Sequence, residues 1–178
     1  MKKLTYLALN DASKKSLETA ETTGLKECVS ISDVLGRVLS SEVRCIKNLP
    51  SFDNSAMDGF AIKHEDAGKQ LKVIATILAG QSIKESLEQG TCYRIMTGAK
   101  VPSDADTIIP IENMIEVNEN IVTLPKEIKK GSNKRFKGEE QAVGSLLFKI
   151  GETIKATHIA MLAAQGITTL EVYKKISI

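Results

Sequence analysis

The chain has 178 residues, of which 42% are hydrophobic and 26% are charged, and its formal net charge is +2. This composition is that of an ordinary globular protein and excludes a disordered chain. The small net charge and the aromatic content of 4% argue against a nucleic-acid partner, which would need a basic surface or stacking aromatic rings. No apolar run approaches the roughly 18 residues of a membrane span, and the first apolar run is too short for a secretory signal. We therefore expect a cytoplasmic protein with no membrane partner.

The cysteines and histidines limit the kinds of metal site. Cys28, Cys45 and Cys92 are widely spaced and form no C-x-x-C pair, which favours neither a disulfide framework nor a zinc site. His64 and His158 are the only histidines, and we assign neither a catalytic role. A metal that takes part is therefore expected to be a hard cation on oxygen ligands.

The first quarter of the chain predicts two helices and two strands. An apolar stripe among lysines and glutamates predicts a helix over residues 7–22, and a short strand follows at 27–31. A second apolar face predicts a helix over 32–39. Residues 41–46 are then typical of a strand.

The middle of the chain has the pattern of a β domain. Short runs rich in Ile, Val and Thr are separated by Gly and Pro. These runs predict strands at 71–78, 93–96, 107–111, 114–117 and 121–124. The sequence Asn118-Glu119-Asn120 suits the turn of a hairpin between the last two runs.

The last part of the chain predicts a return to mixed helix and strand. A strand is expected at 146–148, a helix at 157–165 with Thr157 as its N-cap, and a strand at 167–178. Gly166 is placed to end the helix in a left-handed conformation. We therefore expect an α+β (mixed) fold in which a β-rich domain, residues 46–146, is inserted into a discontinuous α/β domain formed by residues 1–45 and 147–178.

The first candidate site lies in residues 50–60. Asp53, Asn54, Ser55 and Asp58 bring four oxygen-bearing side chains into six positions. Carboxylates in such a loop suit Mg²⁺ held against phosphates. The alternative is a polar turn in which these side chains bond nearby backbone N–H groups.

The second candidate lies in residues 94–102, where a strand is expected to end in Thr97 and Gly98. Such a loop can offer a hydroxyl and backbone N–H groups to an anion. It lacks the spacing of a Walker phosphate-binding loop. The alternative is a simple turn at the end of the strand.

The third candidate lies in residues 133–140, where basic side chains stand beside paired carboxylates. Arg135 suits bidentate binding of phosphate or molybdate. Glu140 suits a role at a metal or as a base. The alternative is a solvated charged loop without function.

Together these stretches resemble the MoeA family, which includes the gephyrin E domain. Residues 50–62 resemble its S-A-M-D-G-[YF]-A motif with the lead-in P-x-F-D-N, and residues 94–102 resemble R-I-M-T-G-A-x-x-P. Residues 133–140 resemble N-x-R-x-x-G-E-D. The segments at 105–112 and 162–167 also fit, so that order and spacing agree over nearly the whole chain.

The resemblance implies a reaction and partners. MoeA-like proteins insert molybdate into adenylyl-molybdopterin, which releases AMP and gives molybdenum cofactor. They are elongated homodimers with the inserted arrangement of their first two domains. Their active site lies where the β domain of one subunit faces the molybdopterin-binding domain of the other. The resemblance thus implies molybdate and adenylyl-molybdopterin as substrates, Mg²⁺ as a cofactor, and a molybdopterin adenylyltransferase as pathway partner.

The resemblance also assigns roles to residues of this chain. Asp58 and Thr97 are expected to be catalytic. Four residues are expected to bind substrate: Ser55, Gly98, Arg135 and Glu140. Metal ligands are not assigned residue by residue. Because a carboxylate faces anions only across a cation or with a proton, we expect Asp58 to handle Mg²⁺ or a metal-bound water. The loops that carry Asp58, Thr97 and Arg135 must then converge on one wall of an anion-binding crevice.

Two features depart from the family pattern. The family usually has aspartate where this chain has Glu140. The sequence also ends at Ile178, where the family's molybdopterin-binding domain, with its G-D-E motif, should begin. We therefore expect a fragment that is inactive alone. The alternatives are a dimerisation and scaffold module of the same family and an unrelated Mg²⁺-dependent phosphohydrolase.

Overall fold

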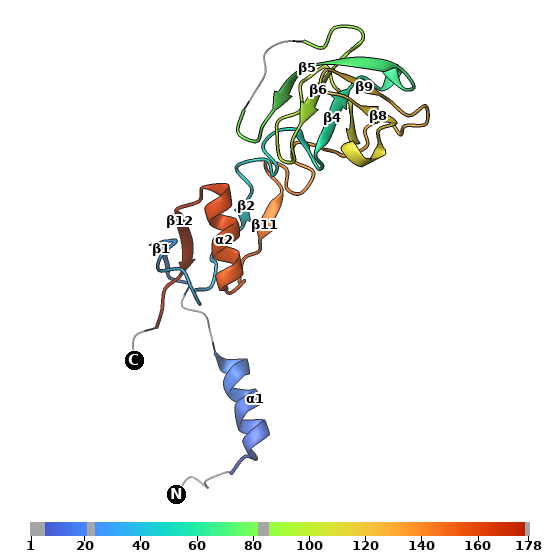
Figure 1. Ribbon diagram of the computed structural model, residues 1–178. Helices are drawn as coiled ribbons and strands as arrows, with labels where there is room; N and C mark the ends of the chain where they lie inside the picture. The colour runs from blue at the N-terminus through green and yellow to red at the C-terminus, as the bar shows by residue number, and fades with distance from the viewer. Residues whose placement is uncertain (1–5, 21–23, 82–85, 177–178) are drawn as a thin grey trace, which may run out of the picture. The chain divides into compact units, whose positions relative to one another are not determined.

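The computed structural model describes residues 6–20, 24–81 and 86–176 (Figure 1). The chain divides into two compact units. The inserted unit is Val43–Leu147, and the discontinuous unit combines Met1–Glu42 with Phe148–Ile178. Their limits differ by a few residues from the domain boundaries expected at 45/46 and 146/147. The fold is therefore mixed, with a β-rich unit inserted into a discontinuous α/β unit.

The inserted unit is built on a curled six-stranded sheet in the order β7-β4-β6-β5-β9-β8. Its strands are β4 Gly59–Ile62, β5 Gln70–Ile77, β6 Thr91–Ile95, β7 Thr107–Pro110, β8 Glu116–Val117 and β9 Ile121–Thr123. Strands β5 and β6 pair in parallel, and the other neighbours are antiparallel. The hairpin predicted around residues 118–120 is confirmed, since Val117 pairs with Val122 across that turn.

Both faces of this sheet are covered, which is why its central strands are rich in Ile and Val. One core contains Ala61, Tyr93 and Ile95. The other contains Phe60 and Cys92. Alternate residues of β4 and β6 thus enter different cores, as the pleat of a strand requires.

Two small two-stranded pairings bring distant segments of the chain together. β3, Asn54–Ser55, pairs antiparallel with β10, Lys134–Arg135. β2, Val43–Arg44, pairs with β11, Leu146–Phe148. Short 3-10 helices follow β4 and β7, as η1 His64–Asp66 and η2 Ile111–Asn113.

The discontinuous unit contains the helices. β1, Lys26–Ser30, pairs antiparallel with β12, Thr169–Tyr173. Helix α2 spans Ala156–Gln165, and α1 spans Leu9–Thr19. The buried apolar side chains of this unit are Val34, Leu39, Phe148, Ile154, Leu162, Leu170 and Val172, whereas α1 buries none.

The helix predicted over residues 32–39 is wrong. The backbone there forms turns, and Gly36 has a φ of 73°, which interrupts a right-handed helix. The N–H of Gly36 donates to Ile154 O at 2.9 Å, and the N–H of Leu39 donates to Glu152 O at 3.0 Å. The N–H groups of Arg37 and Asp33 close local turns on Val34 O and Ser30 O, whereas those of Gly36 and Leu39 are satisfied by a distant segment, so no continuous helix forms.

The boundaries of other predicted elements need small corrections. Helix α2 has Lys155 as its N-cap, so Thr157 lies inside the first turn and does not cap it. Gly166 is left-handed at φ 77°, and its predicted role as a helix stop is confirmed. The strands expected at 41–46 and 167–178 are shorter than predicted, and residues 21–22 and 177–178 of the predicted elements lie outside the described part.

Among the described residues, no helix is long and apolar enough to cross a membrane. Both α-helices are short, at 11 and 10 residues, compared with the roughly 20 that a bilayer requires.

Gly59 is required by the close approach of β4 and β7. A Cβ at this position would lie 2.0 Å from Ile109 O. We expect Gly59→Ala to lower the free energy of unfolding by at least about 2 kcal/mol, because overpacking typically costs ~1–3 kcal/mol. Urea denaturation of the native chain and of the variant measures this change in the free energy of unfolding. Gly90→Ala is the control, since Gly90 has no atom within 4 Å of its Cβ and carries only left-handed strain at φ 79°. Equal losses in both variants would contradict the steric explanation.

Candidate functional site

The centre of the candidate site is a direct contact between Asp58 and Thr97. Asp58 immediately precedes β4, and Thr97 lies two residues after β6, the strand that pairs with β4. Asp58 Oδ1 accepts two hydrogen bonds, from the backbone N–H and from the hydroxyl of Thr97, each at 2.7 Å. Both residues are exposed. The structure thus brings together the two residues that the sequence proposed as catalytic.

The hydrogen bonds from Thr97 lower the pKa of the Asp58 carboxyl. The backbone N–H of Thr97 is the largest cause, its hydroxyl is the next, and the positive charge of Arg94 adds to both. Because hydrogen bonds to the charged form favour that form, Asp58 is a carboxylate at neutral pH.

Ser55 is buried and supports the turn around it. Its hydroxyl lies 2.5 Å from Met57 O, to which it donates, and accepts from the N–H of Met57 at 3.3 Å. Its backbone N–H donates to Ala99 O, and its carbonyl accepts from the N–H of Gly98. The side chain predicted to bind substrate therefore makes both of its hydrogen bonds with Met57, within its own loop.

The backbone N–H groups of the loop at 96–99 all donate to acceptors within the protein. The N–H of Met96 donates to Ile77 O, and that of Thr97 donates to Asp58. The N–H groups of Gly98 and Ala99 donate to Ser55 O and Met96 O. Gly98 has a φ of 78°, so its role in this structure is to form the turn.

Arg135 and Glu140 form an ion pair. Arg135 Nη1 lies 3.0 Å from Glu140 Oε1, and the two side chains are 53% and 58% exposed. Exposed pairs of this kind contribute roughly 0–1 kcal/mol to stability, so both groups remain able to exchange partners. Arg135 is aligned with Asn54 in the β10–β3 pairing, which places the third candidate stretch beside the first.

Lys134 and Asp53 hold the site loop together, and the sequence did not indicate that these two residues contact each other. Lys134 is nearly buried, with 12% of its side chain exposed, and its Nζ lies 3.0 Å from Asp53 Oδ2. A hydrogen bond from the N–H of Lys137 is the largest cause of the lowered pKa of Asp53, and Lys134 adds to it. The two residues are 81 positions apart, so only the β3–β10 pairing reveals the contact.

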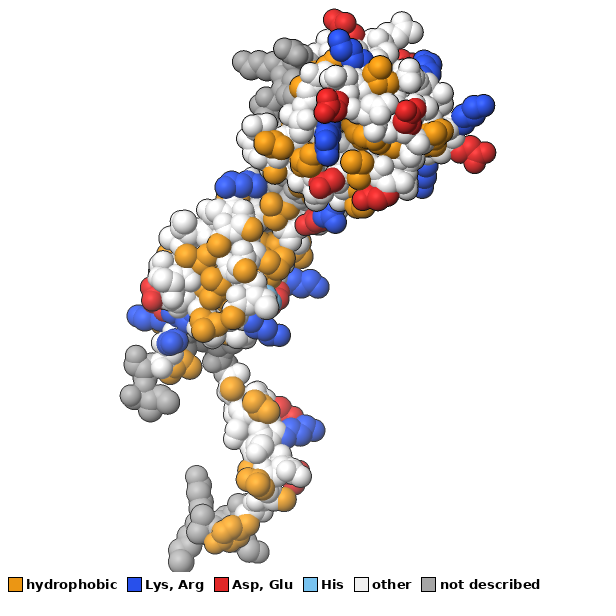
Figure 2. Space-filling model, in the orientation of Figure 1, with side chains coloured by type: hydrophobic (Ala, Val, Ile, Leu, Met, Phe, Trp, Pro, Cys, Tyr) orange, Lys and Arg blue, Asp and Glu red, His pale blue; other side chains and the backbone are white. Residues whose placement is uncertain are grey.

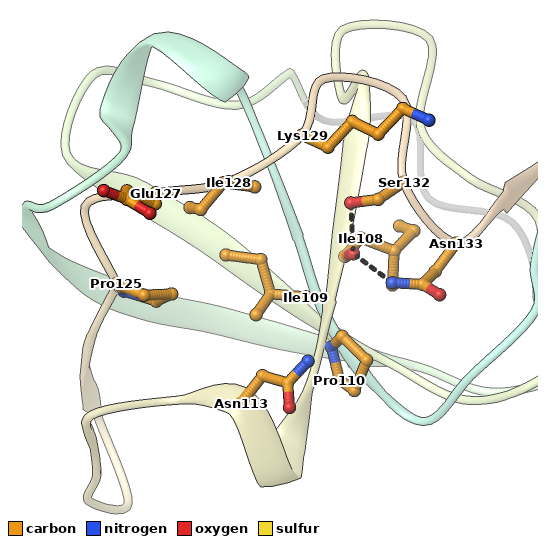
Figure 3. Close-up of a pocket in the computed structure, with 10 residues that line it drawn as sticks. All are labelled: Ile108, Ile109, Pro110, Asn113, Pro125, Glu127, Ile128, Lys129, Ser132 and Asn133. Atoms are coloured by element: carbon orange, nitrogen blue, oxygen red, sulfur yellow. Dashed lines mark hydrogen bonds between the residues drawn. The ribbon is translucent and has the colours of Figure 1, made fainter.

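A cavity of about 380 Å³ lies beside β7 and contains none of the predicted site residues (Figure 3). Ile108 and Ile109 form its middle, and the side chains of Ser132 and Asn133 both donate to Ile108 O. Asn133 has a φ of 56°, and its carbonyl accepts from the N–H of Ala56. Asn133 therefore connects this cavity to the loop before Asp58.

Within the described ranges, no group of three or more His, Cys, Asp or Glu side chains gathers where it could hold a metal. Both histidines have protein partners, since His64 Nε2 lies 2.9 Å from Ile128 O and the ring of His158 stacks on Phe148. The three cysteines are free thiols, and burial raises the pKa of Cys92 to about 12.

Charge is mixed over the surface of the inserted unit. On the face shown in Figure 2, Lys and Arg side chains alternate with Asp and Glu instead of forming a basic stripe over the described residues. Several carboxylates have a basic partner, as in the contact of Asp106 with Lys130 at 3.4 Å. This agrees with the small net charge of the whole sequence.

A β unit inserted into a discontinuous α/β unit is the architecture of this chain, and solved MoeA proteins share its fold. The family described as "MoeA N-terminal region (domain I and II)" matches residues 7–166. The chain belongs to this family.

The relatives and solved structures agree with this assignment. The molybdopterin molybdenumtransferase of Staphylococcus aureus (strain MSSA476) is 34% identical over 157 residues, which cover 84% of this chain and 37% of that enzyme. The enzyme of the same name from Staphylococcus epidermidis is 33% identical over 83% of this chain and 36% of its own length. The molybdopterin biosynthesis MoeA protein of Pyrococcus horikoshii OT3 superposes with a TM-score of 0.84 at 28% identity, covering 93% of this chain and 45% of the other. The chain thus spans little more than a third of its curated relatives.

Replacing Thr97 by valine tests the contact with Asp58. In the native chain, NMR titration of the Asp58 carboxyl carbon should give a pKa below the ordinary value. Thr97→Val should raise this pKa only in part, because the backbone N–H, the larger cause, remains. Since the folded pKa is lowered, the contact stabilises the fold above the ordinary Asp pKa, and this contribution is lost as pH falls through the lowered one. Thr76→Val, on the exposed side of β5, is the control, and identical Asp58 titrations in all three proteins would refute the contact.

Replacing Gly98 by alanine tests the role of the turn. A Cβ there has open space, so the only cost is the left-handed backbone, about 1–2 kcal/mol. Denaturation should show this loss of stability. The pKa of Asp58 should also rise, because the turn positions Thr97. An unchanged stability together with an unchanged Asp58 pKa would rule out this structural role.

Proposed function

We propose that this chain is the N-terminal part of a molybdopterin molybdenumtransferase, which inserts molybdate into adenylyl-molybdopterin with release of AMP. The observation that carries the proposal is the contact of the Asp58 carboxylate with Thr97 in a chain of the MoeA family. The names of the staphylococcal relatives supply the reaction class. Molybdate, molybdopterin and an adenylylated intermediate are thus the proposed substrates.

Asp58 and Thr97 are the proposed catalytic residues. The hydroxyl of Thr97 holds Asp58 Oδ1, which leaves Oδ2 without an assigned hydrogen bond in the described residues. The proposed substrate-binding residues are Ser55, Gly98, Arg135 and Glu140. For Arg135 and Glu140 the support is their exposed ion pair, which an anionic substrate could open so as to bind the guanidinium. Ser55 and Gly98 contribute by shaping the loop from which Thr97 reaches Asp58.

Mg²⁺ is proposed as a cofactor that the substrate helps to bind. Magnesium is commonly held by one or two carboxylates together with substrate phosphates, and Asp58 Oδ2 fits one such ligand. The described residues do not supply a complete set of ligands themselves. When bound, Mg²⁺ would neutralise the charge of the pyrophosphate and molybdate oxygens. Asp58 itself would supply a fixed negative charge, because its pKa is lowered.

The part of the relatives that this chain does not match is proposed to supply the remaining substrate contacts. The chain covers 36–37% of the staphylococcal enzymes. We therefore propose that the 178 residues alone bind molybdopterin weakly and do not insert molybdenum. The cytoplasm is the proposed compartment, and the three free thiols suit its reducing conditions.

The reaction is tested by joining this chain to the remaining part of the Staphylococcus aureus enzyme. The chain alone should release no AMP from adenylyl-molybdopterin and molybdate, whereas the fusion should do so. Asp58→Asn in the fusion should lower AMP release by about a hundredfold or more, because it removes a charged group from the reacting centre. Glu65→Gln, an exposed change in η1, should have no effect. Full activity of the Asp58→Asn fusion would support the non-catalytic scaffold instead.

A homodimer is the proposed assembly, and a molybdopterin adenylyltransferase is the proposed pathway partner. Support for a subunit contact comes from α1, where Leu9 and Leu17 are 81% and 77% exposed and no residue is buried. Apolar side chains at such exposure favour burial against a partner. Sedimentation should therefore give about twice the chain mass of 19.3 kDa. Leu9→Glu combined with Leu17→Glu should give the monomer, and a native chain that sediments as a monomer would contradict the proposal.

A further inference from the structure

Asp53 lies one residue before β3 and bonds to both of the other candidate stretches. Its backbone carbonyl accepts from the N–H of Val101, in the second stretch, at 2.9 Å. Its carboxylate contacts the third stretch, at Lys134 and at Lys137. Asp53 is not among the residues proposed for catalysis or substrate binding, yet it joins the loops that carry them.

The two oxygens of this carboxylate bind on either side of Arg135. Oδ2 lies 3.0 Å from Nζ of Lys134, the residue before Arg135. Oδ1 accepts the backbone N–H of Lys137, two residues after Arg135, at 2.8 Å. A single carboxylate therefore restrains both ends of the segment 134–137, which carries Arg135.

The contact with Lys134 is partly shielded from water. Asp53 is half-buried and Lys134 is nearly buried, and the ammonium of Lys134 also donates to Ala105 O at 3.4 Å. The alternation of side chains along β10 turns Lys134 inward and leaves Arg135 exposed. Because screening by water weakens exposed pairs most, this pair restrains the segment more than the exposed pair of Arg135 with Glu140 does.

Backbone pairing alone gives the segment little restraint. β10 contains only Lys134 and Arg135, and in the described structure it pairs with β3 alone. Two-stranded pairings are marginally stable without further contacts. The side-chain contacts of Asp53 therefore supply an important part of what fixes the backbone at Arg135.

We propose that Asp53 is a positioning residue that acts on the substrate through Arg135. Its carboxylate fixes the backbone from which the guanidinium reaches an anion, and Lys134 supplies the charge that keeps this carboxylate in place. Arg135 is thus ordered before the substrate arrives, which lowers the entropy cost of binding. The effect on the substrate rests on the proposed function, whereas the restraint on the segment can be measured in the chain alone.

The restraint is tested by amide NMR of the 178-residue chain. Asp53→Ala should speed hydrogen exchange of the Lys137 N–H about tenfold, because its acceptor is lost. The backbone order parameter of Arg135 should fall from about 0.85 to below about 0.6. Asp53→Asn should restore slow exchange in part, since an amide oxygen can accept the same bond. Lys134→Met removes only the ion pair, so it should loosen Arg135 and leave Lys137 closer to native.

The effect on the substrate is tested in the fusion with the remaining part of the Staphylococcus aureus enzyme. Arg135→Gln should raise the KM for an anionic substrate. Asp53→Ala should raise the KM for the same substrate about tenfold and change kcat by less than about twofold, because a binding contact is weakened in ground state and transition state alike. The double variant should match Arg135→Gln alone, since residues that act through one contact are not additive.

Asp66→Asn is the matched control for a loss of stability. Asp66 is buried and forms another carboxylate–lysine pair of the inserted unit, with its Oδ1 2.7 Å from Lys69 Nζ. Breaking this pair should destabilise the fold, because it leaves a buried group without its partner. It should leave the KM of the fusion and the order parameter of Arg135 at their native values.

The possible results separate the two claims. An unchanged order parameter of Arg135 in the Asp53→Ala chain would overturn the restraint, and Asp53→Asn and Lys134→Met decide the same point if Asp53→Ala does not fold. Additive increases in KM, or a loss confined to kcat, would overturn the action through Arg135. A native fusion that releases no AMP would count against the proposed reaction only, because the measurements on the chain still decide the restraint.

Discussion

The backbone hydrogen bonds of β3 are the constraint on which the candidate site depends. Ser55 exchanges bonds with Gly98 and Ala99 on one side, and β3 pairs with β10 on the other. Three stretches from distant parts of the sequence are thereby fixed to one another. The Asp58–Thr97 contact can form at 2.7 Å because both residues leave this junction in defined directions. An ion pair between Lys134 and Asp53 also joins β10 to the residue before β3.

Local sequence patterns predicted most of the strands and turns, because these elements depend mainly on residues that are close together in the sequence. The strands of the β unit, the hairpin turn at 118–120, and the helix stop at Gly166 follow from alternation and from turn chemistry. The helix at 32–39 failed because Gly36 and Leu39 bond to residues 152–154, more than 100 positions away. No periodicity within that segment could show that its hydrogen-bond partners lie there.

The candidate site likewise has features that local sequence indicates and features that depend on distant contacts. Motif resemblance identified Asp58 and Thr97, because their neighbours in sequence are distinctive. It could not show that the N–H groups of the 96–99 loop are used internally, since their acceptors include Ser55 O and Ile77 O. Arg94 begins the second motif stretch, but the sequence assigned it no role of its own. Its charge is one cause of the lowered pKa of Asp58, and the pairing of β4 with β6 brings the two residues to the same end of the sheet.

The edge of the β sheet at β7 is closed to further strands. Pro110 has no N–H to donate, and the N–H of Ile108 already donates to Ser132 O. The carbonyl of Ile108 accepts from the side chains of Ser132 and Asn133 (Figure 3). An unprotected edge would be a template for pairing between molecules. The segment that bears Asn133 therefore protects the protein from aggregation as well as anchoring the loop before Asp58.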